Sequence, residues 1–282
     1  MASVQKVAEP MMPAATHGGS PLELRLREFA DETEASLASL LQGDGPPELS
    51  RAEHYALFGS AKRFRPFLAA ACFDLLELPA EQAKTVGAAA EMAHAASLVF
   101  DDLPCMDASE IRRAAPSLYR ATDEATAVLA GLSLVLRAVQ LLTSPASGID
   151  AELRAQLAMR FAESCGAAGL AGGQFLDLAG AVTSNAQKTA PLMGFCCEAA
   201  AICAGKSPVI VEQFRDFGEA LGRLYQHRDD ELDDDGTGEP SAKQVEYERT
   251  QHLLALLPKP APGSELGALL PAMVDWVAGR AA

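Results

Sequence analysis

The sequence contains few aromatic residues, and this shortage already narrows the fold. Aromatic residues make up 6% of the 282 residues, with one tryptophan and four tyrosines. Aromatic and β-branched residues are the usual strand formers, whereas Ala and Leu dominate here, so the composition favours helices over sheets. A chain of this length can bury a large core. We therefore predict a single all-α domain.

Basic residues are also scarce. The chain has 23 Lys and Arg against 38 Asp and Glu, a formal net charge of -15. This balance argues against a nucleic-acid partner, because nucleic-acid binders are usually basic. The net negative charge would also repel an anionic substrate, unless bound cations and nearby Lys or Arg side chains make the local electrostatic potential positive.

Long apolar runs and a secretory signal are missing as well. No uninterrupted apolar run reaches the roughly 18 residues of a transmembrane helix. Residues 1–20 lack the basic-then-apolar order of a signal peptide. We expect a disordered tail over residues 1–20, one domain over residues 21–282, no transmembrane segment and a cytoplasmic location.

The cysteines form no Cys-x-x-Cys pair. Most lie in Ala- and Leu-rich stretches, where cysteine behaves as a small apolar residue. We predict buried free thiols in a reducing compartment rather than a metal–thiolate site. The six are Cys72, Cys105, Cys165, Cys196, Cys197 and Cys203.

Helical periodicity runs through almost the whole chain after residue 20. Pro46-Pro47 interrupts it early, and Pro104 should end or kink a long Ala-rich helix. No strand pattern is convincing. The expected helices cover residues 23–41, 51–58, 67–76, 81–100, 121–142, 150–178, 188–204, 209–233, 244–257 and 266–279.

Two acidic clusters, at residues 101–107 and 229–233, carry the strongest chemical signal. An acidic run alone is usually a solvated surface. The first cluster, however, directly follows the apolar residues 95–100, where ionised carboxylates need compensation. A hard divalent cation would supply it, because such ions take oxygen ligands and commonly bridge carboxylates to substrate phosphates. The candidate metal ligands are Asp101, Asp102, Asp107, Asp229, Asp230 and Asp233.

Cationic and polar side chains could hold phosphate groups near these carboxylates. Two adjacent arginines offer planar forks, and the segment Lys188-Thr189 is expected to open a helix whose N–H groups attract anions. Each position also has a structural explanation, such as a solvated lysine or a core histidine. The candidates are Lys62, Arg63, His94, Arg112, Arg113, Gln174, Thr189 and Gln226.

In this order, the motifs resemble the trans-isoprenyl diphosphate synthase (polyprenyl synthetase) family, most closely its bacterial geranylgeranyl and farnesyl diphosphate synthases. The resemblance covers roughly residues 50–235. It implies an isoprenoid-synthase-type helical bundle around a deep central cavity. It also implies a homodimer, or a heteromer with an active homologue. The motifs are KRFRP at 62–66, His94, FDDLPCMD at 100–107, RR at 112–113, GQ at 173–174, KT at 188–189 and YQHRDDELD at 225–233.

The resemblance implies a Mg²⁺-dependent prenyltransferase that condenses isopentenyl diphosphate with dimethylallyl, geranyl or farnesyl diphosphate. Ionisation of the allylic diphosphate would fall to Asp101, Asp102, Asp107, Lys188, Asp229 and Asp230. Binding of isopentenyl diphosphate would fall to Lys62, Arg63, His94 and Arg113. Help at the allylic end would come from Arg112, Lys188 and Gln226.

Two small residues, Ala96 and Ser97, stand five and four positions before Asp101. In the resembling family a bulky aromatic at the first position stops the chain at C15. Ala96 therefore implies a longer product, geranylgeranyl diphosphate.

The chain also departs from the family pattern. Ser60-Ala61 replaces a Gly-Gly pair, Ala114-Ala115 replaces Gly-Lys, and the cation-rich lid expected after the second cluster is short of lysines. Two alternatives therefore stay open. One is a weakly active or inactive paralogue that acts as a partner subunit, and the other is a diphosphate-ionising enzyme of the terpene-synthase type.

Overall fold

The structure, a computed structural model, describes residues 20–41, 45–59, 61–180, 184–233 and 240–279. Within these ranges it does not describe the side chains of residues 184–187, 230, 232–233 and 240–241. The predicted tail over residues 1–20, Ser20 apart, and the predicted lid after Asp233 therefore lie outside the described residues.

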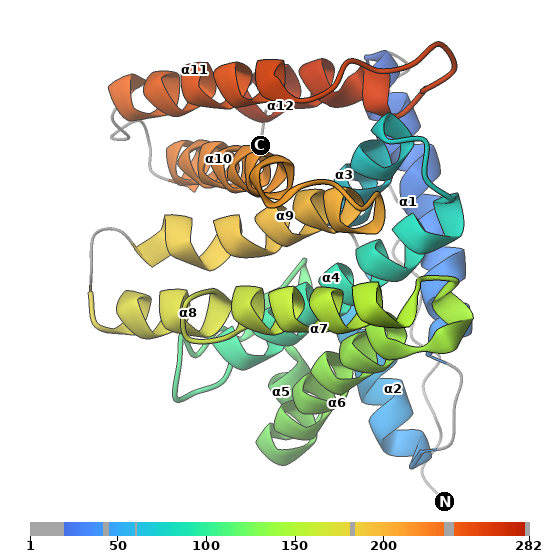
Figure 1. The fold of residues 1–282 in the computed structure, drawn as a ribbon. Helices are drawn as coiled ribbons and strands as arrows, with labels where there is room; N and C mark the ends of the chain where they lie inside the picture. The colour runs from blue at the N-terminus through green and yellow to red at the C-terminus, as the bar shows by residue number, and fades with distance from the viewer. Residues whose placement is uncertain (1–19, 42–44, 60, 181–183, 234–239, 280–282) are drawn as a thin grey trace, which may run out of the picture.

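The described chain is built of helices, which confirms the all-α prediction (Figure 1). The first half contains α1 (Pro21–Leu40), α2 (Pro47–Leu57), α3 (Phe64–Leu75), α4 (Ala80–Asp101), α5 (Leu118–Ala121) and α6 (Glu124–Thr143). The second half contains α7 (Ala151–Cys165), α8 (Leu170–Leu178), α9 (Ser184–Cys203), α10 (Pro208–Asp233), α11 (Pro240–Leu256) and α12 (Leu270–Gly279). Two 3₁₀ turns are η1 (Pro145–Ser147) and η2 (Gly267–Leu269).

Three local features differ from the sequence predictions. A short antiparallel hairpin, β1 (Ile111–Arg112) and β2 (Ala115–Pro116), follows the first acidic cluster, where no strand was expected. The stretch predicted to be helical over residues 150–178, around a glycine-containing segment at 166–173, is two separate helices, and the chain turns between them at residues 166–169. Helix α9 begins at Ser184 rather than at Lys188, so Lys188 lies inside a helix and not at its first turn.

The core lies around α3, α4 and α9. A helix that is apolar on all sides is stable only when surrounded, and α3 and α9 are buried along most of their length. In Figure 1, α8, α9, α10 and α11 lie one above another, and each packs on the next. Helix α4 packs against α3 and α6.

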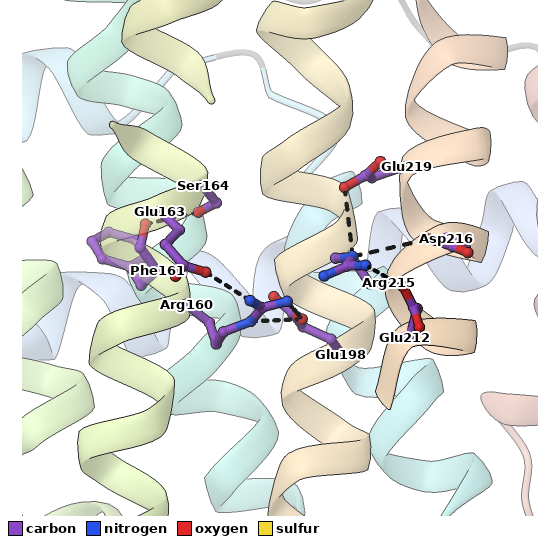
Figure 2. A network of polar contacts seen from close by, with 9 residues as sticks. All are labelled: Arg160, Phe161, Glu163, Ser164, Glu198, Glu212, Arg215, Asp216 and Glu219. Atoms are coloured by element: carbon purple, nitrogen blue, oxygen red, sulfur yellow. Dashed lines mark hydrogen bonds and ion pairs between the residues drawn. The ribbon is translucent and has the colours of Figure 1, made fainter. Parts of the chain in front are cut away.

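A buried ion pair ties α7 to α9. Arg160 of α7 donates from Nε and Nη2 to one oxygen of the buried Glu198 of α9, at 3.0 and 2.7 Å (Figure 2). Burial raises the pKa of Glu198, and the guanidinium opposes that rise. Because a buried carboxylate needs such a partner, this contact fixes the position of α9, the helix that carries Lys188.

Glycines let α9 and α10 approach closely. A Cβ atom at Gly222 would lie 2.7 Å from the Cα atom of Ala190, and one at Gly218 would lie 2.5 Å from the Met193 carbonyl oxygen. Any larger residue would therefore force the helices apart. The close contact places Thr189 of α9 within hydrogen-bonding distance of Gln226 of α10, at 2.9 Å.

All six cysteines are free thiols, as predicted, but they are not all buried. Cys72, Cys196 and Cys197 are buried, whereas Cys165 and Cys203 are half-buried. Cys105 is exposed, because it lies in the loop after α4 rather than on an apolar helix. The prediction of burial was wrong for this residue.

Helix α6 is the one described helix that is long and apolar enough to cross a membrane, judged by length and composition alone. In this structure it packs against α4, α2 and α7. Its outer face keeps Leu129, Leu132 and Leu136 exposed at 55%, 50% and 54%.

Candidate active site

The first acidic cluster begins where α4 ends. Asp101 is the last residue of α4 and Asp102 caps it, as expected for a helix that must stop before Pro104. The Asp107 N–H donates to the Asp101 carbonyl oxygen at 2.9 Å. This bond folds the loop back, so Asp101 and Asp107 line the same cavity.

The hairpin after this loop presents the two arginines. Arg112 donates from Nη2 and Nε to Asp102 Oδ1 at 2.5 and 3.0 Å, and this contact raises the pKa of Arg112. Arg113 and Ala114 form the two-residue turn, with φ angles of 52° and 62°. Such a turn requires positive φ at both positions and normally uses Asn or Gly. The chain therefore holds Arg113 at the cavity by a strained turn.

The opposite wall comes from α8, α9 and α10. Lys188 Nζ lies 2.9 Å from Asp101 Oδ2 and 3.8 Å from Asp177 Oδ2. Burial raises the pKa of Asp101, and Lys188 opposes that rise. Gln174 Nε2 lies 3.5 Å from Asp107 Oδ1. The buried Oε1 of Gln174 has no hydrogen-bond partner. These contacts join the first acidic cluster to Gln174 of α8 and to Lys188 of α9.

A polar cavity of about 600 Å³ lies between these walls. Most of the predicted site residues line it: Lys62, Arg63, His94, Ser97, Asp101, Asp107, Arg112, Arg113, Lys188, Thr189, Gln226 and Asp229. Asp102 instead lines an adjoining cavity, where Arg112 pairs with it. The side chains of Asp230 and Asp233 lie outside the described residues.

Arg63 borders this cavity, but both terminal nitrogens of its guanidinium are hydrogen-bonded within the protein. Its side chain is 0% exposed, and Nη1 donates to Glu91 at 2.7 Å. Nη2 donates to Glu34 at 3.1 Å and to the Leu57 carbonyl oxygen at 2.8 Å. Arg63 itself has φ of 49° and precedes α3. These contacts describe a residue that anchors the loop, and a substrate role for Arg63 stays a prediction.

Arg65, two residues later, lines the same cavity and was not among the predicted site residues. It is half-buried, and its buried Nε has no hydrogen-bond partner. The sequence offered a signal for it, since Arg63 and Arg65 are equivalent cations on either side of Phe64. Both arginines keep a buried Nε without a hydrogen-bond partner, and only the tertiary contacts show that the terminal nitrogens of Arg63 are already paired within the protein.

His94 completes the cationic side of the cavity without carrying charge itself. Burial lowers its pKa well below the ordinary value, and nearby Arg65 and Arg113 add to that effect. Burial also lowers the pKa of Arg113, and the charges of Arg63, Arg112 and Arg65 add to the decrease. A neutral imidazole beside several guanidinium groups can donate one N–H to a phosphate oxygen.

An apolar cavity of about 370 Å³ adjoins the polar one along α4. Both cavities share Ser97, Asp101, Leu170 and Lys188. Ala96, which is fully buried, and Ser97 line the apolar cavity, so both predicted chain-length positions face it. The rest of its wall, which the sequence did not reveal, includes Ala93, Phe100, Met106, Val135, Cys165, Phe175 and Leu178.

The carboxylates of the polar cavity have the chemistry that Mg²⁺ requires. Among the described side chains, no three His, Cys, Asp or Glu groups converge closely enough to hold an ion by themselves. Mg²⁺ commonly takes only one or two carboxylates together with substrate phosphates. Asp101 and Asp107 on one wall and Asp229 on the other supply such oxygen ligands. The donor set therefore fits an ion shared with a diphosphate.

The amino-acid sequence is similar to those of known proteins. The polyprenyl synthetase family pattern matches residues 46–251. A farnesyl diphosphate synthase of Bacillus subtilis (strain 168) is 36% identical over 217 residues, which is 73% of each chain. The geranylgeranyl pyrophosphate synthase 6 of Arabidopsis thaliana is 33% identical over 211 residues, which is 70% of this chain. The match spans 63% of that plant protein, less than two thirds of its length.

Solved structures agree with the sequence comparison. An FPP/GFPP synthase from Zymomonas mobilis has a TM-score of 0.79 at 29% identity, with 90% of this chain and 98% of that chain covered. A geranyltransferase from Legionella pneumophila has a TM-score of 0.78 at 27% identity, with 90% and 96% covered. Both the matched pattern and the shared fold lead to one conclusion: this chain belongs to the polyprenyl synthetase family.

Proposed function

We propose that this chain condenses isopentenyl diphosphate with an allylic diphosphate and releases geranylgeranyl diphosphate as its main product. The family and the names of its relatives make it a short-chain trans-prenyltransferase. The observation that carries the proposal is the pair of adjoining cavities. One is lined by carboxylates and cations and suits two diphosphates, and the other is apolar and suits a growing hydrocarbon chain.

The charged side chains divide between the two substrates by position. Lys188 lies where the cavities meet, beside Asp101, and can hold the allylic diphosphate. When bound, Mg²⁺ would draw charge onto that leaving group and assist ionisation of the allylic C–O bond. Aspartates 101, 107 and 229 would hold it, and Mn²⁺ could replace it. The side chains of Asp230 and Asp233 are proposed as further ligands from sequence alone.

The second diphosphate fits the opposite, cationic end of the cavity. Lys62, Arg65, Arg113 and the neutral His94 line this end, and each can donate to a phosphate oxygen. Bound there, isopentenyl diphosphate presents its double bond to the allylic cation. The proton lost after C–C bond formation passes to the departing diphosphate, so no separate protein base is required. The apolar walls keep water away from the cation.

Product length follows from the size of the apolar cavity. The residue facing it five positions before Asp101 is Ala96, which leaves the passage along α4 open. The walls beyond it are formed by α6, α7 and α8, through Val135, Cys165 and Leu178. This arrangement supports a product longer than C15.

A homodimer is proposed from the outer face of α6. Leu129, Leu132 and Leu136 follow helical spacing and are about half exposed. An apolar stripe of this kind on a helix usually packs against another protein surface. A Leu132→Glu variant should convert a dimer to a monomer in analytical ultracentrifugation. A wild type that sediments as a monomer would contradict the homodimer, and the alternative would then be a heteromer with an active homologue.

A cytoplasmic location stays a prediction.

The test of the activity is direct. The purified chain is incubated with isopentenyl diphosphate, Mg²⁺ and each allylic diphosphate in turn, and products are identified by mass. Asp101→Asn should lower turnover by at least about 100-fold, as for loss of one preorganised charge-stabilising group. The control is Asp216→Asn on α10, whose half-exposed side chain lines neither cavity, and it should keep full activity. A wild type that yields no prenyl product would favour the partner-subunit alternative.

A further inference from the structure

Phe100, the residue directly before the first acidic cluster, projects from α4 toward α6 at the one glycine of that helix. A Cβ atom at Gly131 would lie 2.7 Å from Cζ and 2.8 Å from Cε1 of the Phe100 ring. Real Cβ atoms do not approach other atoms this closely. The phenyl ring therefore occupies the space that any side chain at position 131 would need.

The same ring is part of the wall of the apolar cavity. It also packs against a small cluster that contains the buried residues Leu103, which follows α4, and Ala127 and Ala130 of α6. Close-packed surroundings of this kind cannot absorb a displaced ring. A ring pushed away from α6 moves toward the cavity whose wall it forms.

We propose that Gly131 sets the depth of the apolar cavity, because it lets the Phe100 ring lie against α6. Gly131 does not itself line the cavity and acts through Phe100, so it is a positioning residue for product length. This inference rests on the proposed function, since it assumes that the growing prenyl chain occupies this cavity. The role proposed for Ala96 depends on a side chain that lines the cavity, whereas here the depth of the cavity depends on a contact between α4 and α6.

The experiment compares product distributions from isopentenyl diphosphate and geranyl diphosphate, from which both C15 and C20 can form. Gly131→Ala should lower the ratio of C20 to C15 product by about tenfold or more, the usual effect of one misplaced carbon in a hydrophobic pocket. The double variant Gly131→Ala with Phe100→Leu removes the clash and should restore the wild-type ratio. Phe100→Trp, which enlarges the ring at the same position, should shorten the product as Gly131→Ala does.

The matched control is Gly194→Ala on α9. Its Cβ atom would meet Glu219 Cγ at 2.8 Å, a comparable clash with a side chain, and neither residue lines the apolar cavity. Its product ratio should equal that of the wild type.

Two results would overturn the inference: an unchanged ratio in both Gly131→Ala and Phe100→Trp, or a short product that persists in the double variant. If Gly131→Ala does not fold, Phe100→Trp decides alone. A wild type without any product would refute the proposed function itself, and this inference with it.

Discussion

Replacing Arg63 by alanine tests whether this arginine anchors the fold or binds substrate. Arg63 has no exposed side-chain surface and pairs with Glu91, which is itself only 3% exposed. It also pairs with the half-exposed Glu34 and donates to the Leu57 carbonyl oxygen. The alanine variant would leave the Glu91 carboxylate buried without its partner.

The expected loss in the free energy of unfolding is about 3–5 kcal/mol, the usual cost of removing one member of a buried ion pair. Most of it arises at Glu91, because the pair with Glu34 is open to solvent and contributes little. For a chain of this size the melting temperature should fall by about 10 °C. Urea titration and thermal unfolding followed by far-ultraviolet circular dichroism measure both quantities.

Arg65→Ala is the comparison, because this arginine lines the same cavity and is only half-buried. It should cost only about 1 kcal/mol of stability, a common value for point substitutions. Its KM for isopentenyl diphosphate should rise by about tenfold or more, since a charge-assisted hydrogen bond contributes about 1.5–3 kcal/mol. The reasoning fails if Arg63→Ala keeps wild-type stability and raises that KM instead.

Three further results are expected. Ala96→Phe should fill part of the 370 Å³ cavity and shift the main product to C15; mass spectrometry of the products checks this, and an unchanged distribution would contradict it. His94 has a lowered pKa in the folded state, so its contribution to stability is complete above pH 6.5 and is lost as the pH falls below it. The stability advantage of the wild type over His94→Gln should therefore shrink toward pH 5, by up to about 1.4 kcal/mol per pH unit. If the free energies of unfolding of the two proteins instead change in parallel with pH, a buried neutral imidazole is ruled out. Ala114→Gly should relieve about 1–2 kcal/mol of left-handed strain, offset in part by chain entropy, and raise the melting temperature; a lower value would show that the turn is not strained.

The sequence by itself determined the helical class and most of the residues that line the polar cavity. Helices follow from Ala- and Leu-rich periodic segments, because that signal is local in the chain. The acidic and basic motifs could be identified because diphosphate chemistry requires particular residue types in a particular order. Asp101, Lys188 and Asp229 could thus be expected to share a site, although they belong to three different helices.

Only the tertiary structure decided which of several equivalent residues does what. Arg63 and Arg65 look alike in the sequence, but Glu91 and Glu34, distant in the chain, pair with the buried Arg63, whereas Arg65 is only half-buried at the cavity. The depth of the apolar cavity likewise depends on Phe100 meeting Gly131 across two helices. Such contacts arise from the packing of whole helices, and local sequence patterns carry no information about which side chains will meet.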